Sequence, residues 1–417
     1  MSTISSLTFS LLISSSLFYQ GLAIAAPSRD FIPTDDSVVI EKLSPRISSR
    51  VTAVKISRAA SADGLANGVA HGLQDTKNVR AAISAAKEWI SLSKKTSDPR
   101  YLGRAQATLT PWWDDIKAPS EVAVLKATIQ QSRHEFDAAR STLKRMLDMD
   151  PSNAQAWLTL ATLERLSGNY DLALQACSNV KAQSASDQST ELFAAACRLE
   201  TSSMMGQVDQ ARAGFALLIK STGDEATQAW FYSLLAESEE RAGLDAKALK
   251  AYRTSIALSA DNYTALALSD LLLRGGKFSE AIAALDKLPL SDSVLLRRAY
   301  ANKRLNNDSW KAMRDELSER FAALKARGDD ERLHARELAL AALWLEDNAV
   351  KALPVAQSNL ELQKEPFDWW LVVAAAEKAN QPLLLKQLLG SVKQSKLFDA
   401  RLSKFESKVT LASRQFK

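Results

Sequence analysis

The sequence predicts an all-α protein, an α–α superhelix built from helix-turn-helix repeats. The first observation is a shortage of turn residues, with 14 Gly and 11 Pro among 417 residues, against usual shares of about 7% and 5%. The second is a pattern of large, small and glycine positions that returns at a spacing of about 34 residues. Each unit would form one pair of helices, and we expect roughly seven to nine pairs.

Composition also narrows the class of function. Charged residues make up 24% of the chain, as in an average soluble protein. The net charge of +5, from 53 basic and 48 acidic side chains, is too small for a dedicated nucleic-acid binder. We therefore expect no nucleic acid as a partner.

Residues 1–25 are interpreted as a signal peptide. No side chain from Met1 to Ser28 is charged, and an apolar stretch precedes Ala23-Ile24-Ala25, a small-x-small pattern typical of signal peptidase sites. We expect cleavage after Ala25 and a periplasmic mature chain. No Cys follows the apolar stretch, so lipoprotein attachment is not expected. The alternative is an uncleaved membrane anchor.

The clearest repeat begins at Ala154. In a frame counted from there, positions 4, 7, 8, 15, 17, 20 and 24 hold Trp157, Leu160, Ala161, Gly168, Tyr170, Ala173 and Cys177. Large residues beside a small one let the first helix pack closely on the second. Glycine closes the turn, the aromatic ring fills the crevice, and alanine at position 20 allows close approach. This pattern resembles the tetratricopeptide repeat almost residue for residue.

The same frame returns on both sides of this repeat, and it sets the domain boundaries. Further frames begin at Ser120, Leu192, Ala229 and Asn262. Two of the steps between frames exceed one unit by a few residues, and we expect longer loops to absorb the excess. The clearest repeats span 120–291, within an array over 77–385. Residues 26–76 read as an irregular leader with one short strand at Ser37 to Ile40.

The flanks of the array are degenerate versions of the same unit. Helix pairs are predicted over 77–114, 292–327, 329–364 and 367–390, with turns at Thr96-Ser97-Asp98, Asn306-Asn307, Asp347-Asn348 and Gln381-Pro382.

No motif for catalysis or metal binding accompanies the repeats. The three His residues, His71, His134 and His334, lie in different repeats, and none has a second ligand at metal-binding spacing. No nucleophile elbow or cysteine protease signature is present. The sequence therefore predicts a non-enzymatic chain without cofactor or metal. The alternative is an enzyme without a known motif, for example one acting on cell-wall glycans.

Cys177 and Cys197 lie at equal distances from residue 187, which is inside the polar link at 183–189. Residues equidistant from the turn of an antiparallel hairpin lie level with each other, so a disulfide could form in an oxidising compartment. It would close a loop of about 20 residues. The alternative is two small buried thiols.

The resemblance implies a concave surface that binds extended or helical peptides, lined by positions 2, 5, 9, 12 and 13 of each first helix. Carried over by frame, the candidate partner-binding residues are Arg165, Phe193, Trp230, Arg241, Tyr263 and Arg274. Aromatic side chains beside arginine are typical of binding hot spots. The competing interpretation is that Trp230 and Tyr263 only seal contacts between helices. The implied function is a scaffold or assembly factor of the periplasm, or alternatively an accessory subunit of an envelope enzyme or transport complex.

The C-terminal end of the chain is basic. Residues 386–417 carry eight Lys and Arg against Asp399 and Glu406. We interpret them as a capping helix with a solvated outer face, which repeat arrays need for solubility. The alternative is weak contact with an anionic surface.

Overall fold

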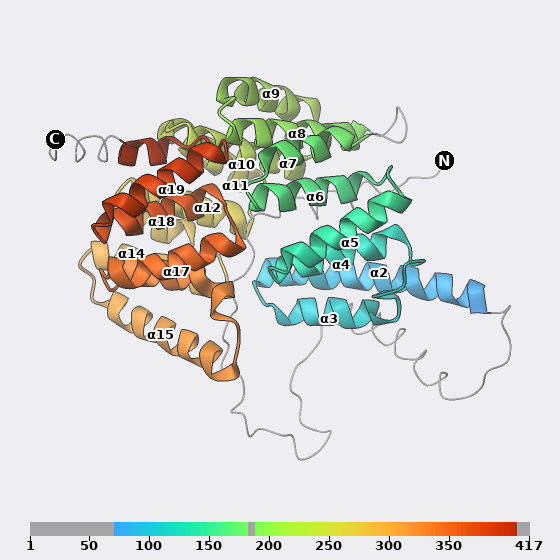
Figure 1. Cartoon of the computed structure of the whole chain (residues 1–417), viewed down its shortest axis with the longest axis horizontal. Coiled ribbons are helices and arrows are strands. Elements are labelled where there is room, and N and C mark those ends of the chain that lie inside the picture. The colour runs from blue at the N-terminus through green and yellow to red at the C-terminus, as the bar shows by residue number, and fades with distance from the viewer. Residues whose placement is uncertain (1–70, 182–187, 407–417) are drawn as a thin grey trace, which may run out of the picture.

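The computed structural model describes residues 71–181 and 188–406. Within these ranges the chain contains helices and no strand, as the sequence predicts (Figure 1). Nine helical hairpins follow one another: α2 (His71–Thr96) with α3 (Arg100–Leu109), α4 (Ser120–Ser132) with α5 (Phe136–Met149), α6 (Ala154–Leu166) with α7 (Tyr170–Asn179), α8 (Gln188–Met204) with α9 (Val208–Ser221), α10 (Glu225–Arg241) with α11 (Asp245–Leu258), α12 (Asn262–Arg274) with α13 (Phe278–Ala284), α14 (Asp292–Arg304) with α15 (Ser309–Arg327), α16 (Ala335–Trp344) with α17 (Ala349–Leu362), and α18 (Pro366–Lys378) with α19 (Pro382–Gln394). Short 3-10 turns, η3 (Thr110–Trp112) and η4 (Glu331–His334), follow α3 and precede α16.

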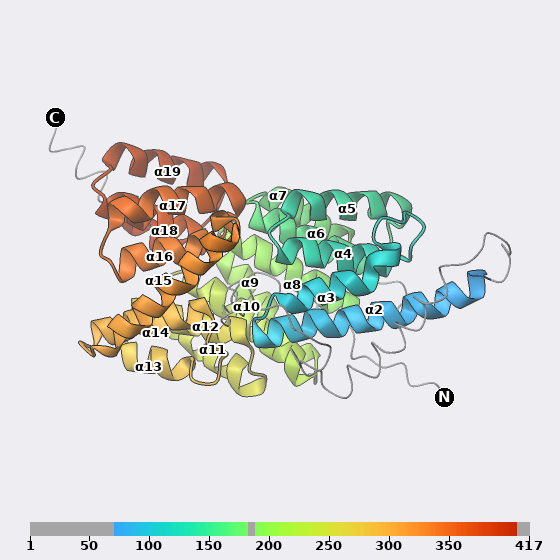
Figure 2. The same cartoon turned by 90° about the horizontal axis from the view of Figure 1, so that it is seen from below.

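The hairpins stack into two layers. The first helices contact one another in two runs, α2 to α10 and α12 to α18. Each second helix packs on its own partner and, except for α15 and the last one, α19, on the first helix that follows. Figure 2 shows the stack curving from α2–α7 on the right, through α8–α12, to α14–α19 on the left. The first helices therefore form the inner layer of a superhelix.

The turns within the hairpins lie where the repeat pattern places them. The residue at or near position 15 adopts a left-handed conformation in each: Ser97, His134, Gly168, Gly206, Gly243, Gly276, Asn306, Asp347 and Asn380. Glycine adopts this conformation without a steric penalty, and Asn or Asp tolerate it better than most residues. His134, one of the three histidines, is thus a turn residue.

Alanines at positions 8 and 20 explain the close packing of the pairs. They are fully buried, with 0% exposure at Ala127, Ala139, Ala161, Ala173, Ala211, Ala236, Ala248 and Ala281. A larger side chain at these points would force the helices apart, which costs about 1–3 kcal/mol per overpacked site. The predicted small positions are therefore confirmed.

One of the two longer steps contains the longer connecting segment that we expected, residues 180–187 between α7 and α8, and the other is accommodated by longer helices. Both α8 and α10 are 17 residues long and begin before the frame starts at Leu192 and Ala229. Only the short segment 222–224 separates α9 from α10. An added helical turn satisfies its own backbone hydrogen bonds, so it extends a repeat without exposing polar backbone.

Two of the predicted domain boundaries also differ from the helix boundaries in the structure. The first helix begins at His71 rather than at residue 77, and residue 386 lies inside α19 (Pro382–Gln394). Residues 386–417 are therefore not one capping helix, because they contain the end of α19, a turn and a further helical stretch at 400–406. The signal peptide and the strand at Ser37 to Ile40 lie outside the described residues.

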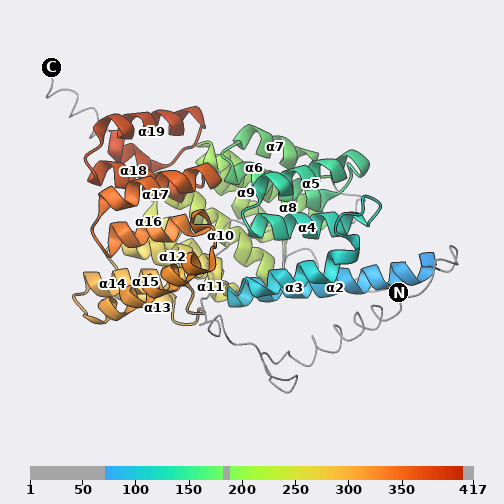
Figure 3. The ribbon, with the colours of Figure 1, turned by 60° about the horizontal axis from the view of Figure 1, so that its bottom comes forward.

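Hydrogen bonds between distant repeats close the superhelix. The backbone N–H of Lys364 donates to the carbonyl of Leu166, and that of Phe398 donates to the carbonyl of Met204, each at 2.7 Å. The two donors lie one repeat apart in the sequence, and both acceptors end first helices. Asn262 likewise donates its side-chain amide to the carbonyls of Lys94 and Lys95 at 3.2 Å. Successive superhelical turns therefore touch, as the compact arrangement in Figure 3 shows.

Within the described ranges, no helix has the length and apolar character needed to cross a membrane.

Candidate functional site

A cavity lined largely by charged and aromatic side chains lies where the inner helices and the end of the described chain converge. Its volume is about 90 Å³, enough for several water molecules or one side chain. We call it the inner cavity. It is lined by Met204, Glu237, Glu240, Arg241, Tyr252, Tyr263, Ala267, Asp270, Arg297, Arg336, Glu365, Pro366, Phe367 and Arg401.

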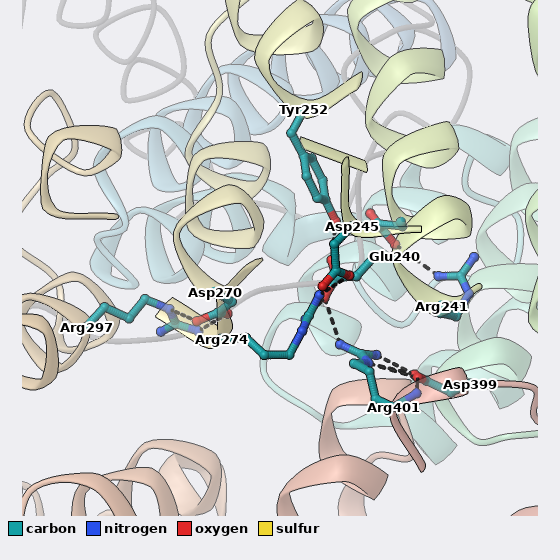
Figure 4. Close-up of polar contacts among 10 residues, drawn as sticks. Glu240, Arg241, Asp245, Tyr252, Asp270, Arg274, Arg297, Asp399 and Arg401 are labelled. Atoms are coloured by element: carbon teal, nitrogen blue, oxygen red, sulfur yellow. Dashed lines mark hydrogen bonds and ion pairs between the residues drawn. The ribbon is translucent and has the colours of Figure 1, made fainter. Parts of the chain in front are cut away.

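Glu240, near the end of α10, contacts both the next first helix, α12, and the segment that follows α19. Its Oε1 accepts from Arg274 at 2.5 Å and from Arg401 at 2.9 Å, and Tyr252 donates to its Oε2 at 3.0 Å (Figure 4). Burial alone would raise the pKa of this carboxyl, but the two guanidinium groups outweigh it, so its pKa lies below the ordinary value. Glu240 is therefore a buried anion shared by two cations.

The N-terminus of α18 carries a second charged cluster. Arg336 of α16 donates to both oxygens of Asp368, at 2.7 and 2.8 Å, and to Glu365 at 2.5 Å. Asn359 donates to Asp368 at 2.7 Å, and the backbone N–H of Glu365 does so at 3.0 Å. Pro366 occupies the first helical position, where no backbone N–H is needed. Two carboxylates at a helix N-terminus also interact favourably with the helix dipole.

A less completely paired cluster lies between α10 and α12. Arg241 is 3% exposed, donates to Ser203 at 2.7 Å and lies 3.6 Å from Glu237. Its Nε has no hydrogen-bond partner among the described residues. Glu237 in turn accepts from the hydroxyl of Tyr263. Beside them, Arg297 donates twice to Asp270, at 2.7 Å in both bonds.

Two carboxyl groups of the inner cavity have raised pKa values. Burial raises the pKa of Glu237 to about 7, although Arg241 opposes the shift. Burial also raises the pKa of Glu365 to about 7. The positive charge of Arg336 lowers this pKa, and the negative charge of Asp368 raises it further. Both groups are therefore partly protonated near neutral pH.

Replacing Glu237 and Glu365 by Gln should make stability less dependent on pH. The ordinary pKa is 4.5, so between about pH 4.5 and 7 the folded chain binds more protons than the unfolded chain. The free energy of unfolding should therefore fall as pH rises through this window, by on the order of 1–3 kcal/mol per group. Urea unfolding at pH 5, 6, 7 and 8 measures the slope, which should be shallower in Glu237→Gln/Glu365→Gln. An identical slope in both proteins would contradict the raised pKa values.

The six predicted partner-binding residues fall into two groups. Arg241 and Tyr263 line the inner cavity, and Arg274 reaches it through Glu240. Arg165 is buried and pairs with Glu200 at 3.0 Å, whereas Phe193 and Trp230 pack ring against ring at 5.5 Å. Trp230 is half-buried, and its ring contacts the first helix of the preceding hairpin.

Sequence reasoning missed the residues that the C-terminal repeats contribute. Arg336, Glu365 and Phe367 line the inner cavity from α16 and the start of α18. The Glu-Pro pair at 365–366 predicts a helix start, but nothing local indicates what that start faces. Arg401 was interpreted as part of a solvated face, yet its side chain is only 11% exposed and binds Asp399 and Glu240.

Cys177 of α7 and Cys197 of α8 form a disulfide, with their Cα atoms 5.6 Å apart. Both residues are buried, at 0% and 4% exposure. The bond links two consecutive hairpins across the segment 182–187, which lies outside the described residues.

Replacing both cysteines by serine should lower the free energy of unfolding by roughly 3 kcal/mol, because the closed loop no longer restricts the unfolded chain. Urea unfolding with and without reductant measures the effect. Reduced wild type should match Cys177→Ser/Cys197→Ser, while reductant should leave the variant unchanged. A wild type insensitive to reductant would mean that the thiols are free.

The inner cavity offers little to a cofactor or metal. Among the described residues, no three His, Cys, Asp or Glu side chains are placed so that they could hold a metal ion. Sites for drug-sized ligands enclose about 300–1,000 Å³, well above this volume. The arrangement can instead accept a side chain that exchanges charge-assisted hydrogen bonds with its walls.

A family model matches part of the chain. The family model of the tetratricopeptide repeat matches residues 124–187, from within α4 to the end of the α7 hairpin and its following link. No curated protein matches the sequence.

Solved structures support the fold. The chain is similar to the Rap protein complexed with Competence and Sporulation Factor, at 11% identity and a TM-score of 0.50, over 88% of this chain and 94% of that one. It also matches a tetratricopeptide repeat protein from Parabacteroides merdae (14% identity, TM-score 0.38, 64% and 99% covered). A third match is the APC/C hetero-tetramer Cut9-Hcn1 (15% identity, TM-score 0.45, 79% and 63% covered). The family match identifies tetratricopeptide repeats at residues 124–187, and the left-handed turns and buried alanines of that unit recur in the other hairpins that the structure describes.

Proposed function

We propose that this chain is a non-catalytic scaffold or assembly factor that binds a segment of a partner protein at the inner cavity. Tetratricopeptide repeats build surfaces for protein–protein interaction, and the inner layer is where first helices from several repeats face one another. The mechanism is burial of a partner side chain among paired charges, with no bond made or broken.

The observation that carries this proposal is the composition of the inner cavity. Arginine, tyrosine and phenylalanine side chains, among them Arg241, Tyr263 and Phe367, meet there from different hairpins. These residue types are common in binding hot spots because they combine apolar area with directional hydrogen bonds. Arg241 also retains an unpaired Nε among the described residues. The Rap protein that the chain resembles in fold is described in complex with a factor, which supports a bound partner here.

We further propose that the protein works in the periplasm. The apolar N-terminal segment with Ala23-Ile24-Ala25 supports export, and a disulfide between Cys177 and Cys197 is stable in an oxidising compartment. Fractionation and N-terminal sequencing test the proposal, and we expect a periplasmic chain that starts at Ala26. A chain retained in the cytoplasm with Met1 intact would overturn it.

Site-specific photo-crosslinking in cells tests the interaction. A photoreactive phenylalanine at Phe367, which is half-buried at the inner cavity, should give a discrete adduct. The matched control carries the same group at Trp310 on the outer helix α15. An adduct at Phe367 alone supports the proposal, and its stoichiometry distinguishes a subunit of one complex from a scaffold with many partners. Adducts at Trp310 alone would move the interaction to the outer layer.

A further inference from the structure

We propose that residues 395–406, here called the latch, occupy the rim of the inner cavity in the manner of a bound peptide and must be displaced by a partner segment of the same chemistry. The inference rests on the proposed function, because it specifies how the inner cavity is reached. The latch follows α19, crosses the ends of α8 and α10, and ends in a helical stretch from residue 400.

The latch packs closely over two glycine turns. A Cβ at Gly206 would lie 3.4 Å from Phe398, and a Cβ at Gly243 would lie 3.2 Å from the Cβ of Ala400. Both glycines have positive φ, at 93° and 74°. The backbone N–H of Phe398 donates to the carbonyl of Met204 at the end of α8, at 2.7 Å. The latch thus satisfies a helix terminus as an external peptide would.

Charge fixes the latch at two further points. Arg401 donates to Glu240 at 2.9 Å and is held in place by Asp399, as Figure 4 shows. Lys396 pairs with Asp171 at 2.7 Å, and both side chains are more than half exposed. The first contact lies in the wall of the inner cavity and the second on the surface, where salt screens it. Removing Arg401 from Glu240 therefore opens the inner cavity.

The latch differs from the segment around Lys364, which also contacts a distant repeat, in how it is attached to the fold. Lys364 lies between α17 and α18, so its hydrogen bond to Leu166 cannot break without moving a hairpin. The latch follows the ninth hairpin, and it can leave without displacing any of the paired helices. Its own Leu397 and Leu402 are buried and favour the closed state.

These contacts define the partner segment. It would present a backbone N–H to Met204, followed by the start of a helical turn with a small residue facing Gly243 and an arginine directed at Glu240. Phe398-Asp399-Ala400-Arg401 supplies these groups in the latch itself.

Hydrogen exchange on the full-length chain tests the latch. In Arg401→Gln, exchange of the amides at 396–402 should become about 10-fold faster or more, the loss expected for one charge-assisted hydrogen bond. The matched control is Lys386→Gln, which removes the same charge from an exposed position on α19. A second variant, Lys396→Glu, places like charges together at the surface and should give about a 2- to 5-fold increase without risk to folding. Unchanged exchange in both variants, or equal acceleration throughout α16–α19, would overturn the proposal.

A labelled peptide with the sequence of residues 395–406 provides the second readout. It should bind full-length Arg401→Gln at least about 10-fold more tightly than wild type, because the intact latch competes with it. Equal binding to both proteins, or to neither, would show that the latch is not an exchangeable occupant. Neither measurement needs a natural partner. A latch that opens while Phe367 gives no crosslink would therefore contradict the proposed function and leave the latch standing.

Discussion

Replacing Glu240 by Gln should lower the free energy of unfolding by about 3–5 kcal/mol, because it removes a buried anion shared by Arg401, whose side chain is 11% exposed, and by the half-buried Arg274. Arg274 and Arg401 both donate to this carboxylate, and Glu240 is only 6% exposed. Solvent cannot replace the lost interaction as it would at the surface. Urea unfolding followed by circular dichroism of the helices measures the change.

The matched control is Glu280→Gln. Glu280 also pairs with an arginine, Arg253 at 2.5 Å, but the two side chains are 45% and 55% exposed. Such exposed pairs contribute about 0–1 kcal/mol, so the control should unfold almost as wild type does. Equal losses in Glu240→Gln and Glu280→Gln would mean that burial does not determine the contribution of these pairs.

Replacing Asp368 by Asn should have an effect of similar size, about 3–5 kcal/mol. Asp368 is 1% exposed and accepts hydrogen bonds from Arg336, Asn359 and the backbone of Glu365. An amide in its place would turn an N–H toward the buried guanidinium of Arg336, which has donors only and cannot accept it. Hydrogen exchange in α16 and α18 should accelerate together with the loss of stability.

Asp315→Asn provides the same chemical change at the surface. Asp315 contacts Arg314 at 2.7 Å, and its side chain is 61% exposed. We expect a change below about 1 kcal/mol in this control. If Asp368→Asn were as mild, the cluster at the start of α18 would be hydrated rather than buried.

The two variants also separate two roles of buried charge. Glu240 joins α10 to Arg401 of the latch, 161 positions away in the sequence, whereas Asp368 joins α16 to α18 in consecutive hairpins. Loss of Glu240 should therefore release the latch from the hairpins, and loss of Asp368 should loosen the stacking between two hairpins. Small-angle scattering distinguishes the outcomes, since only the first should increase the radius of gyration.

Much of the fold follows from the sequence because the repeat is a local unit. Position 15 lies at the turn and takes a left-handed residue, whether Gly168 or Asn306, and position 20 takes a buried alanine such as Ala173. These requirements act between residues of one hairpin, so they leave a periodic trace in the chain. The turns at Ser97, Asp347 and Asn380 could be predicted for the same reason.

The candidate site could be predicted only in part. Arg241 and Tyr263 were found because the frame assigns them to the inner face. Phe193 and Arg165 were assigned to the inner face in the same way but are covered by neighbouring side chains, Trp230 and Glu200. Position in a repeat specifies the direction of a side chain, and it does not specify what lies opposite.

By itself, the sequence determined the helical class, the hairpin turns and the small residues that let paired helices approach. Tertiary structure alone decided that Lys364 and Phe398 bind the ends of α6 and α8, and that Arg401 enters the wall of the inner cavity. The reason is geometric. Small rotations between repeats add up over several hairpins to set the superhelical pitch. That pitch brings together residues separated by 161 positions, such as Glu240 and Arg401, and no local pattern records it.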